Sequence, residues 1–102
     1  MTCQEVVFAK AACRIEIEPR PYAVAGPNYA ALMYVIDGDS VLRPVLFRDG
    51  SRVEIHATTE ALALNSAIAM LEERFGAITE PAHGCAEPRI PPRVAEPYLL
   101  RD

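Results

Sequence analysis

The sequence lacks a hydrophobic run long enough to span a membrane. Its longest apolar stretch, Tyr29 to Ile36, has eight residues, whereas a spanning helix needs about 20. The first five residues carry neither a basic region nor a long apolar segment, so they do not resemble a secretory signal. We therefore expect a cytoplasmic protein with no membrane association.

Cysteine and histidine are also scarce. Cys3, Cys13 and Cys85 are an odd set without a close pair, whereas secreted disulfide frameworks show even counts and tight spacing. A zinc site usually needs two close ligand pairs, and His83 with Cys85 is the only local pair, since His56 is remote from both. We expect three reduced thiols, no metal and no other cofactor.

Catalytic motifs are missing as well. No serine lies in a Gly-x-Ser-x-Gly setting, and the five glycines form no phosphate-binding loop. Asp37-Gly38-Asp39 lacks the further ligands of a calcium loop and predicts a reverse turn instead. His83 and Cys85 stand two positions apart, where side chains of an extended segment point to opposite sides. The sequence therefore predicts no catalytic residues and no enzyme.

What the chain does have is the composition of one globular domain. Its 102 residues are 51% hydrophobic and 24% charged, which is close to the usual mix for folded proteins. A chain of this size buries a limited share of its surface. We therefore expect one modest core whose stability would gain from dimerisation.

Alternating and apolar segments predict four strands, at 12–18, 29–36, 41–48 and 52–57. Residues 12–18 alternate apolar with charged side chains, which indicates one buried face. Residues 29–36 are apolar on both faces, and Pro44 marks the third strand as an edge or a bulge. Residues 6–8 form either a separate strand or the start of the first one.

One amphipathic helix is predicted over 59–75. Thr58 or Thr59 caps its N-terminus and Gly76 ends it. Large apolar residues recur on one face at Leu64, Ile68, Leu71 and Phe75.

After Gly76 the sequence becomes rich in proline, with five prolines in residues 77–102. Such a segment favours an extended or polyproline-like tail. The predicted fold is therefore α+β: an antiparallel meander of three to four strands with one C-terminal helix on one face, comprising residues 1–76, followed by the tail 77–102.

The net charge of −4 and pI near 5.1 oppose binding to a phosphate backbone, which is favoured by lysine and arginine. Arg43, Arg48 and Arg52 surround the predicted Asp49-Gly50 hairpin turn and are the candidate nucleic-acid contacts. Strands followed by a helix resemble, in element order alone, modules that read DNA from a sheet face. Acidic neighbours offset these arginines, so nucleic acid is kept as an alternative partner.

The leading functional hypothesis is a small, non-enzymatic protein-interaction module. One helix covers only one face of the sheet, while 29–36 is apolar on both. A second copy of the chain is the expected cover, because homodimers are the commonest assembly. Tyr98, Leu99 and Leu100 are the candidate partner-binding residues. The alternatives are a nucleic-acid-binding regulator, or a small-ligand binder or enzyme with a pocket between helix and sheet.

Overall fold

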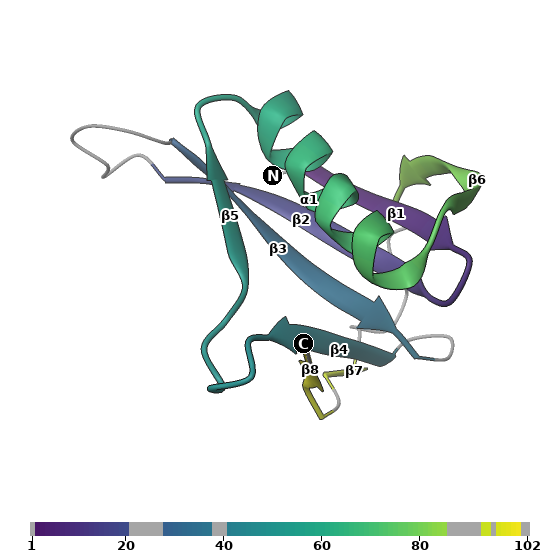
Figure 1. The fold of residues 1–102 in the computed structure, drawn as a ribbon. Coiled ribbons are helices and arrows are strands. Elements are labelled where there is room, and N and C mark those ends of the chain that lie inside the picture. Colours follow the sequence, from purple (N-terminus) through teal and green to yellow (C-terminus); the bar gives the residue numbers. More distant parts are fainter. Residues whose placement is uncertain (1, 21–27, 38–40, 86–92, 95, 101–102) are drawn as a thin grey trace.

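The fold is a twisted β-sheet with one helix packed across one of its faces (Figure 1). The computed structural model describes residues 2–20, 28–37, 41–85, 93–94 and 96–100. Within these residues the elements, in chain order, are β1 (Thr2–Phe8), β2 (Ala12–Pro19), β3 (Tyr29–Ile36), β4 (Val41–Leu46), β5 (Glu54–Ala57), α1 (Glu60–Phe75), β6 (Ile78–Gly84), β7 (Arg93–Val94) and β8 (Tyr98–Leu99).

The sheet does not have the meander topology expected from the sequence. Its strand order is β6-β1-β2-β3-β4-β7, and β5 joins β3 rather than extending the sheet beyond β4. Moreover, β7 and β8 run parallel to β4. The prediction of a three- to four-stranded antiparallel meander with a C-terminal helix was therefore wrong. The helix lies in the middle of the strand succession, because strands after it return to both edges of the sheet.

One edge of β3 is divided between two partners. Its first half, 29–32, pairs with β5, and its second half, 34–36, pairs with β4. A single bridge between Leu46 and Arg52 connects the two partners. In Figure 1, β4 consequently diverges from β5 and from α1 toward the lower end of the molecule. The C-terminal end of α1 lies over β1 and β2 instead, where Phe75 O accepts a hydrogen bond from the Lys10 N–H at 2.9 Å.

Pro44 divides the outer edge of β4 into two short ladders. Val41 and Leu42 pair with β7, whereas Val45 and Leu46 pair with β8. Proline has no N–H to donate to a ladder, and the two parallel ladders lie on either side of it. The sequence expectation of an edge or bulge at Pro44 corresponds to this interruption.

The proline-rich segment is partly β-structure rather than a continuous extended tail. Residues Ile78–Gly84 form β6, an edge strand that pairs with β1 through an irregular register. Pro81 is tolerated there because an edge strand has a side that needs no donor. The first described part of the tail therefore pairs with the sheet.

Helix α1 begins and ends as the sequence indicated. The Thr59 hydroxyl oxygen accepts a hydrogen bond from the Leu62 backbone N–H at 3.1 Å, which identifies Thr59 rather than Thr58 as the N-cap. At the C-terminus Gly76 has φ +91°, and an added Cβ would lie 3.0 Å from Ala9 Cβ. Glycine is therefore required by both conformation and space. No helix among the described residues is long and apolar enough to cross a membrane.

The face that α1 turns toward the sheet contains smaller side chains than expected. Ala63 and Ala67 are fully buried, while Leu64 and Ile68 are only partly buried at the sides of the contact. Small residues at the centre let the helix backbone approach the strands closely. The predicted stripe was correct for Leu71 and Phe75, which are buried, whereas in the first turns the buried positions are Ala63 and Ala67, one residue before the predicted Leu64 and Ile68.

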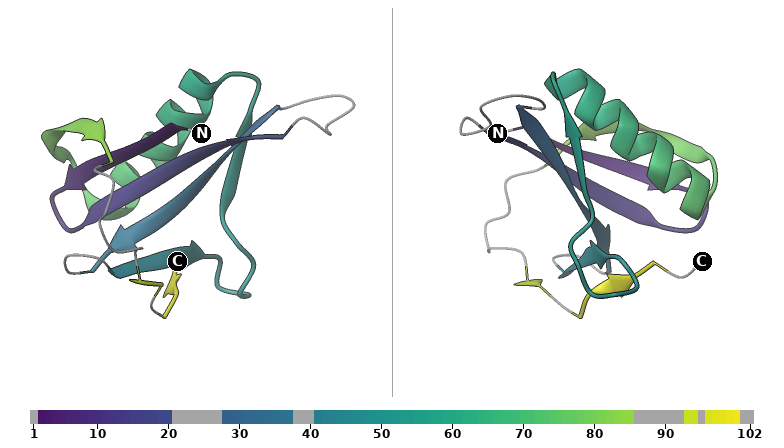
Figure 2. Two further views of the ribbon diagram at one scale, coloured as in Figure 1. Left: turned by 180° about the vertical axis from the view of Figure 1, so that it is seen from behind. Right: turned by 60° about the vertical axis from the view of Figure 1, so that its left-hand side comes forward.

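The core lies between α1 and the inner face of the sheet, on the side where the helix is seen in Figure 2. Its buried members come from every part of the chain: Val6, Phe8, Cys13, Ile15, Ile17, Ala31, Met33, Val35, Val45, Val53, Ala63, Ala67, Leu71, Phe75 and Leu100. Leu100 belongs to this core and donates its N–H to Leu46 O at 2.9 Å. The C-terminal segment thus closes the end of the core that α1 does not reach.

Cys3 and Cys85 form a disulfide, with their Cα atoms 5.5 Å apart. The expectation of three reduced thiols was therefore wrong for these two residues, and Cys13 is the free one, buried in the core. The pairing of β1 with β6 places Gln4 opposite Gly84, so residues 82 positions apart in sequence meet. Spacing alone could not reveal this pair.

Candidate binding pocket

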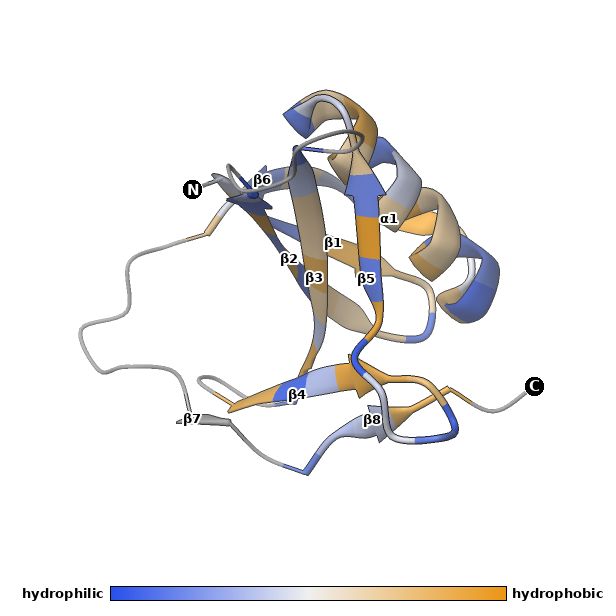
Figure 3. Ribbon diagram, turned by 90° about the vertical axis from the view of Figure 1, so that its left-hand side faces the viewer, coloured by the Kyte–Doolittle hydropathy of each residue, from blue (hydrophilic) through white to orange (hydrophobic). Residues whose placement is uncertain are grey.

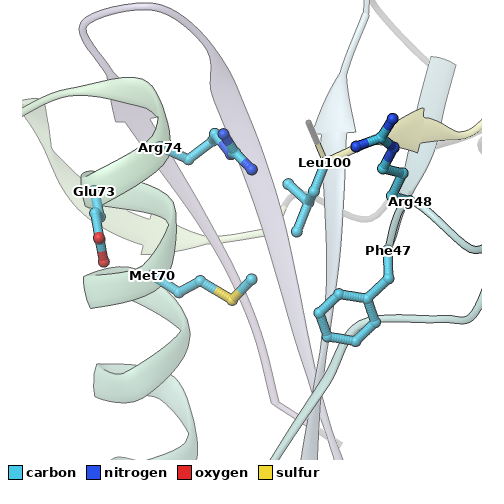
Figure 4. A pocket seen from close by; sticks show the side chains of 6 residues that line it. All are labelled: Phe47, Arg48, Met70, Glu73, Arg74 and Leu100. Carbon is cyan, nitrogen blue, oxygen red and sulfur yellow. The ribbon is translucent and has the colours of Figure 1, made fainter. Parts of the chain in front are cut away.

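A hollow lies where β4 diverges from α1. It has a volume of about 410 Å³ and is lined by Phe47, Arg48, Met70, Glu73, Arg74 and Leu100. We call it the Phe47 pocket. Figure 4 shows the helix residues on one side, facing Phe47, Arg48 and Leu100 on the other. A hollow of this size falls within the range of ligand and side-chain binding sites.

A hydrogen-bonded turn after β4 holds the Phe47 side of the pocket. Phe47 donates its N–H to Ser51 O at 2.7 Å and accepts from the Gly50 N–H at 2.9 Å. Asp49 Oδ1 accepts from the Ser51 hydroxyl at 2.6 Å and from the Ser51 N–H at 2.9 Å. Both hydrogen bonds lower the pKa of the Asp49 carboxyl, and the bond from the Ser51 hydroxyl has the larger effect. Gly50 has φ +92°, which suits glycine.

The turn places an aromatic ring at the surface. Phe47 is 45% exposed, although large apolar side chains are normally buried. Met70 and Leu100 provide further apolar wall, and Leu100 is itself anchored in the core. The pocket therefore combines a fixed apolar floor with an exposed ring that remains available for contact.

Two further hollows adjoin the Phe47 pocket through Arg74, which lines all three. One, of about 460 Å³, is lined by Lys10, Ala11, Val35, Ile36, Asp37, Arg43, Arg74, Phe75 and Tyr98. The other, of about 340 Å³, is lined by Arg43, Arg74, Pro97, Tyr98 and Leu99. Tyr98 lines both hollows, and its ring packs edge-on against Phe75 at 5.3 Å between centroids.

Charges around the three hollows oppose the charge of the whole chain. Lys10, Arg43, Arg48 and Arg74 contribute four cations to the linings. Asp37 and Glu73 are the acidic residues there, whereas the full chain has a net charge of −4. Arg43 is held in place by a hydrogen bond from Nε to Glu96 O at 3.0 Å and by the Tyr98 ring, 5.7 Å from its guanidinium carbon. A local positive field of this kind attracts anionic groups.

The described linings lack the side chains of the common nucleophile–histidine pairs. They include no serine, threonine, cysteine or histidine, and the described residues contain no cluster of three potential metal ligands. Burial raises the pKa of the Cys13 thiol to about 12, so it stays protonated and unreactive near neutral pH. His56 lies on β5 and His83 on β6, away from these linings.

The candidate partner-binding residues all border this region. Tyr98 and Leu99 line the third hollow and Leu100 lines the Phe47 pocket. Tyr98 and Leu100 are largely committed to packing within the chain, whereas Leu99 is 43% exposed. Leu99 is therefore the member of this group that is free to contact a partner.

The three candidate nucleic-acid contacts do not share one surface. Arg43 and Arg48 border the hollows next to α1. Arg52 lies elsewhere, over the Tyr34 ring with 4.6 Å between its guanidinium carbon and the ring centroid. Their proximity in sequence reflects the hairpin, but alternation along the strand sends neighbouring side chains to different faces.

Sequence reasoning missed Phe47, Met70 and Arg74 as site residues. Phe47 fell within a predicted strand, and Met70 and Arg74 within a predicted helix, so each was assigned a structural role. The separation of β4 from β5 creates the pocket, and no local sequence signal reports it. An apolar residue directly before an Asp-Gly turn was the one available hint for Phe47.

No family model, curated protein or solved structure matches the chain. The functional conclusion therefore depends on the geometry of the chain itself.

Proposed function

We propose that this chain is a non-enzymatic protein-interaction module that binds an acidic segment carrying a large apolar side chain. The segment would insert its apolar side chain beside Phe47 and place its carboxylates among Arg43, Arg48 and Arg74. The observation that carries the proposal is an exposed aromatic ring within a basic pocket of a chain with net negative charge.

The apolar part of the pocket supports an anchoring side chain. Binding energy at interfaces concentrates where an aromatic or aliphatic group fills a desolvated pocket. Phe47, Met70 and Leu100 supply such a wall, and the hydrogen-bonded turn fixes the Phe47 backbone before binding. A preformed wall loses little conformational entropy when a partner arrives.

The arginines at the rim, Arg43, Arg48 and Arg74, favour binding of an acidic segment over binding of a neutral or basic one. Arginine binds carboxylates through paired donors and stacks on aromatic rings. Arg43 already lies against Tyr98, so its position is set before any ligand binds. Leu99, exposed beside the same hollow, offers a second apolar contact further along the segment.

Direct binding measurements test this proposal. Labelled short peptides with acidic residues around one leucine or phenylalanine would be titrated by fluorescence anisotropy. Two comparison peptides replace either the acidic residues with lysine or the apolar residue with serine. We expect only the acidic peptide with its apolar residue to bind, and Phe47→Ala to weaken it about tenfold, a loss typical of a buried aromatic contact.

Leu62→Ala is the matched control. Leu62 is also an exposed large apolar residue, at 52%, but it does not line the described hollows. Its truncation should leave peptide affinity unchanged. Equal affinity of the native chain and Phe47→Ala for the acidic peptide would contradict the proposal. Tighter binding to DNA or RNA, falling steeply between about 50 and 200 mM salt, would assign the basic rim to nucleic acid instead.

The cellular compartment in which the protein resides is a separate part of the proposal. A cytoplasmic location was expected from the sequence, but the Cys3–Cys85 disulfide favours an oxidising compartment, because cytosolic thiols are kept reduced. Rapid alkylation of the protein in its own cells, followed by mass spectrometry, distinguishes the two. An alkylated Cys3 and Cys85 would support the cytoplasmic location, and an intact disulfide would support the oxidising one.

A further inference from the structure

The outer face of the sheet, which is turned away from α1, carries an ordered pattern of charge. In Figure 3 the helix lies on one side of the strands and this face lies on the other. We define the outer face by six residues on β2, β3 and the segment entering β5: Arg14, Glu16, Leu32, Tyr34, Arg52 and Glu54. The homodimer expected from the sequence needs a surface of this kind, distinct from the Phe47 pocket.

Strand register arranges these residues in two adjacent rows. Arg14 pairs with Tyr34, and Arg52 covers the Tyr34 ring from the other side. This gives a row Arg–Tyr–Arg across the strands. Two residues along, Glu16 pairs with Leu32, which pairs with Glu54. The second row is therefore Glu–Leu–Glu.

We propose that a second copy of this chain covers the outer face, related by a two-fold axis that runs between the two rows and parallel to them. Such an axis places each Arg–Tyr–Arg row on the Glu–Leu–Glu row of the other copy. Arg14 then faces Glu16 of the second copy, and Arg52 faces Glu54 of the second copy. Each contact occurs twice, as an isologous interface requires.

The apolar residues also match under this operation. Tyr34 faces Leu32 of the second copy at the centre of the interface, where burial contributes most. Leu32 and Tyr34 are only partly buried within one chain. Stacked sheets cross at about −30° because each sheet is twisted. Residues of the two copies therefore lie opposite each other best in the two rows next to the axis.

Three of the four charged residues in the two rows already form ion pairs within the chain, which the second copy would extend. Arg14 and Glu16 form an ion pair at 3.0 Å along β2, and Glu54 pairs with Arg20. Arg52 Nε and Nη2, by contrast, lie out of contact with solvent and have no hydrogen-bond partner among the described residues. No ion pair of Arg52 is formed among the described residues, so a carboxylate of a second copy would contact the part of the guanidinium that these two covered atoms leave open.

The size of the face predicts a weak dimer. Even if the contact extends over β1, β2, β3 and β5, four strands at about 4.8 Å spacing and eight residues at about 3.3 Å each span roughly 500 Å², below the ~800 Å² per partner of a standard interface. Sedimentation equilibrium should therefore cover protein concentrations from about 5 to 500 μM. We expect the native chain to dimerise within this range.

Two charge-reversed variants test the row pairing directly. Arg14→Glu/Arg52→Glu makes both rows acidic, and Glu16→Arg/Glu54→Arg makes both rows basic. Each variant alone should be monomeric, with self-association weakened at least about 100-fold by like charges. An equimolar mixture should form a 1:1 heterodimer, because acidic rows then face basic rows. Circular dichroism establishes that each variant is folded.

Glu72→Arg/Glu80→Arg is the matched control, because it changes the net charge by the same amount as Glu16→Arg/Glu54→Arg. Glu72 and Glu80 are exposed on α1 and β6, respectively. This control variant should dimerise as the native chain does. A native chain that stays monomeric at all concentrations would overturn the proposal. Failure of the folded variants to associate when mixed would overturn it as well. Peptide binding at the Phe47 pocket is measured separately and does not depend on this outcome.

Discussion

At the scale of single residues, the position of Phe47 depends on the Asp49 carboxylate in the following turn. Asp49 Oδ1 accepts two hydrogen bonds from Ser51, and both stabilise the ionised form. Because the ring of Phe47 forms one wall of the proposed binding pocket, protonation of Asp49 should loosen the pocket as well as the turn.

Ser51→Ala should raise the pKa of Asp49 toward the ordinary aspartate value of about 3.9. The Ser51 hydroxyl is the largest cause of the lowered pKa, and its removal leaves the smaller effects of the backbone hydrogen bonds of Ser51 and Asp49. Titration of the Asp49 carboxyl resonance by NMR measures the change. Ser66→Ala, an exposed serine substitution on α1, should leave this titration unchanged.

The lowered pKa also fixes the direction of the pH dependence. Because the folded state holds the Asp49 proton more weakly than the unfolded chain, its stabilising contribution is present above the unfolded pKa, near ~3.9. That contribution is lost as pH falls through the folded pKa. An Asp49 that titrates at the same pH before and after Ser51→Ala would contradict this account of the turn.

At the scale of elements, the first turn of α1 depends on one hydroxyl. Thr59→Ala should lower the free energy of unfolding by about 1 kcal/mol, because an N-cap side chain satisfies a backbone N–H that the helix leaves unpaired. Urea denaturation followed by circular dichroism measures the loss. Thr58→Ala is the matched control, since Thr58 is the adjacent exposed threonine and makes no cap. Equal losses for both variants would show that Thr59 does not cap the helix.

The sequence predicted those elements whose side chains face a core with a regular period. Residues 12–18, 29–36 and 59–75 were expected, and β2, β3 and α1 occupy 12–19, 29–36 and 60–75. Each packs one face against the same core, so burial imposes a period of 2 or 3.6 on its apolar residues. The pattern of apolar residues within a segment is therefore sufficient to predict an element that buries one face.

Strand β6 and the pocket could not be predicted in the same way. Every residue of β6 is exposed, so the strand is selected by backbone pairing with β1 and not by an apolar pattern. The Phe47 pocket arises because β3 divides one edge between β4 and β5. Both features depend on contacts between distant segments, which periodicity within a segment does not encode.

At the scale of the whole molecule, the Cys3–Cys85 disulfide connects the first strand, β1, to the residue that follows β6. It closes a loop with a sequence separation of 82 residues, and the chain-entropy model for such a loop gives a stabilisation of about 4–5 kcal/mol. Domains of this size have total stabilities of only about 5–15 kcal/mol. This one bond is therefore expected to be a major part of the free energy that holds the chain folded.

Reduction should lower the free energy of unfolding by about 3 kcal/mol, since measured losses for native disulfides are about 2–5 kcal/mol and commonly fall short of the entropic limit. Guanidinium denaturation with and without reductant measures the effect. The denaturant dependence should steepen on reduction, because an unconstrained unfolded chain exposes more surface. Both changes act mainly on the unfolded state, so the folded sheet and the Phe47 pocket should persist in the reduced protein under native conditions.

The double variant Cys3→Ser/Cys85→Ser separates this effect from any action of reductant on Cys13. Its denaturation midpoint should equal that of the reduced native chain and should not respond to reductant, because the buried Cys13 thiol takes part in no disulfide. A native chain whose midpoint is the same with and without reductant would instead mean that β1 and β6 are held together by strand pairing alone. Since that pairing is irregular in register and lies at an exposed edge, we expect the covalent link to dominate.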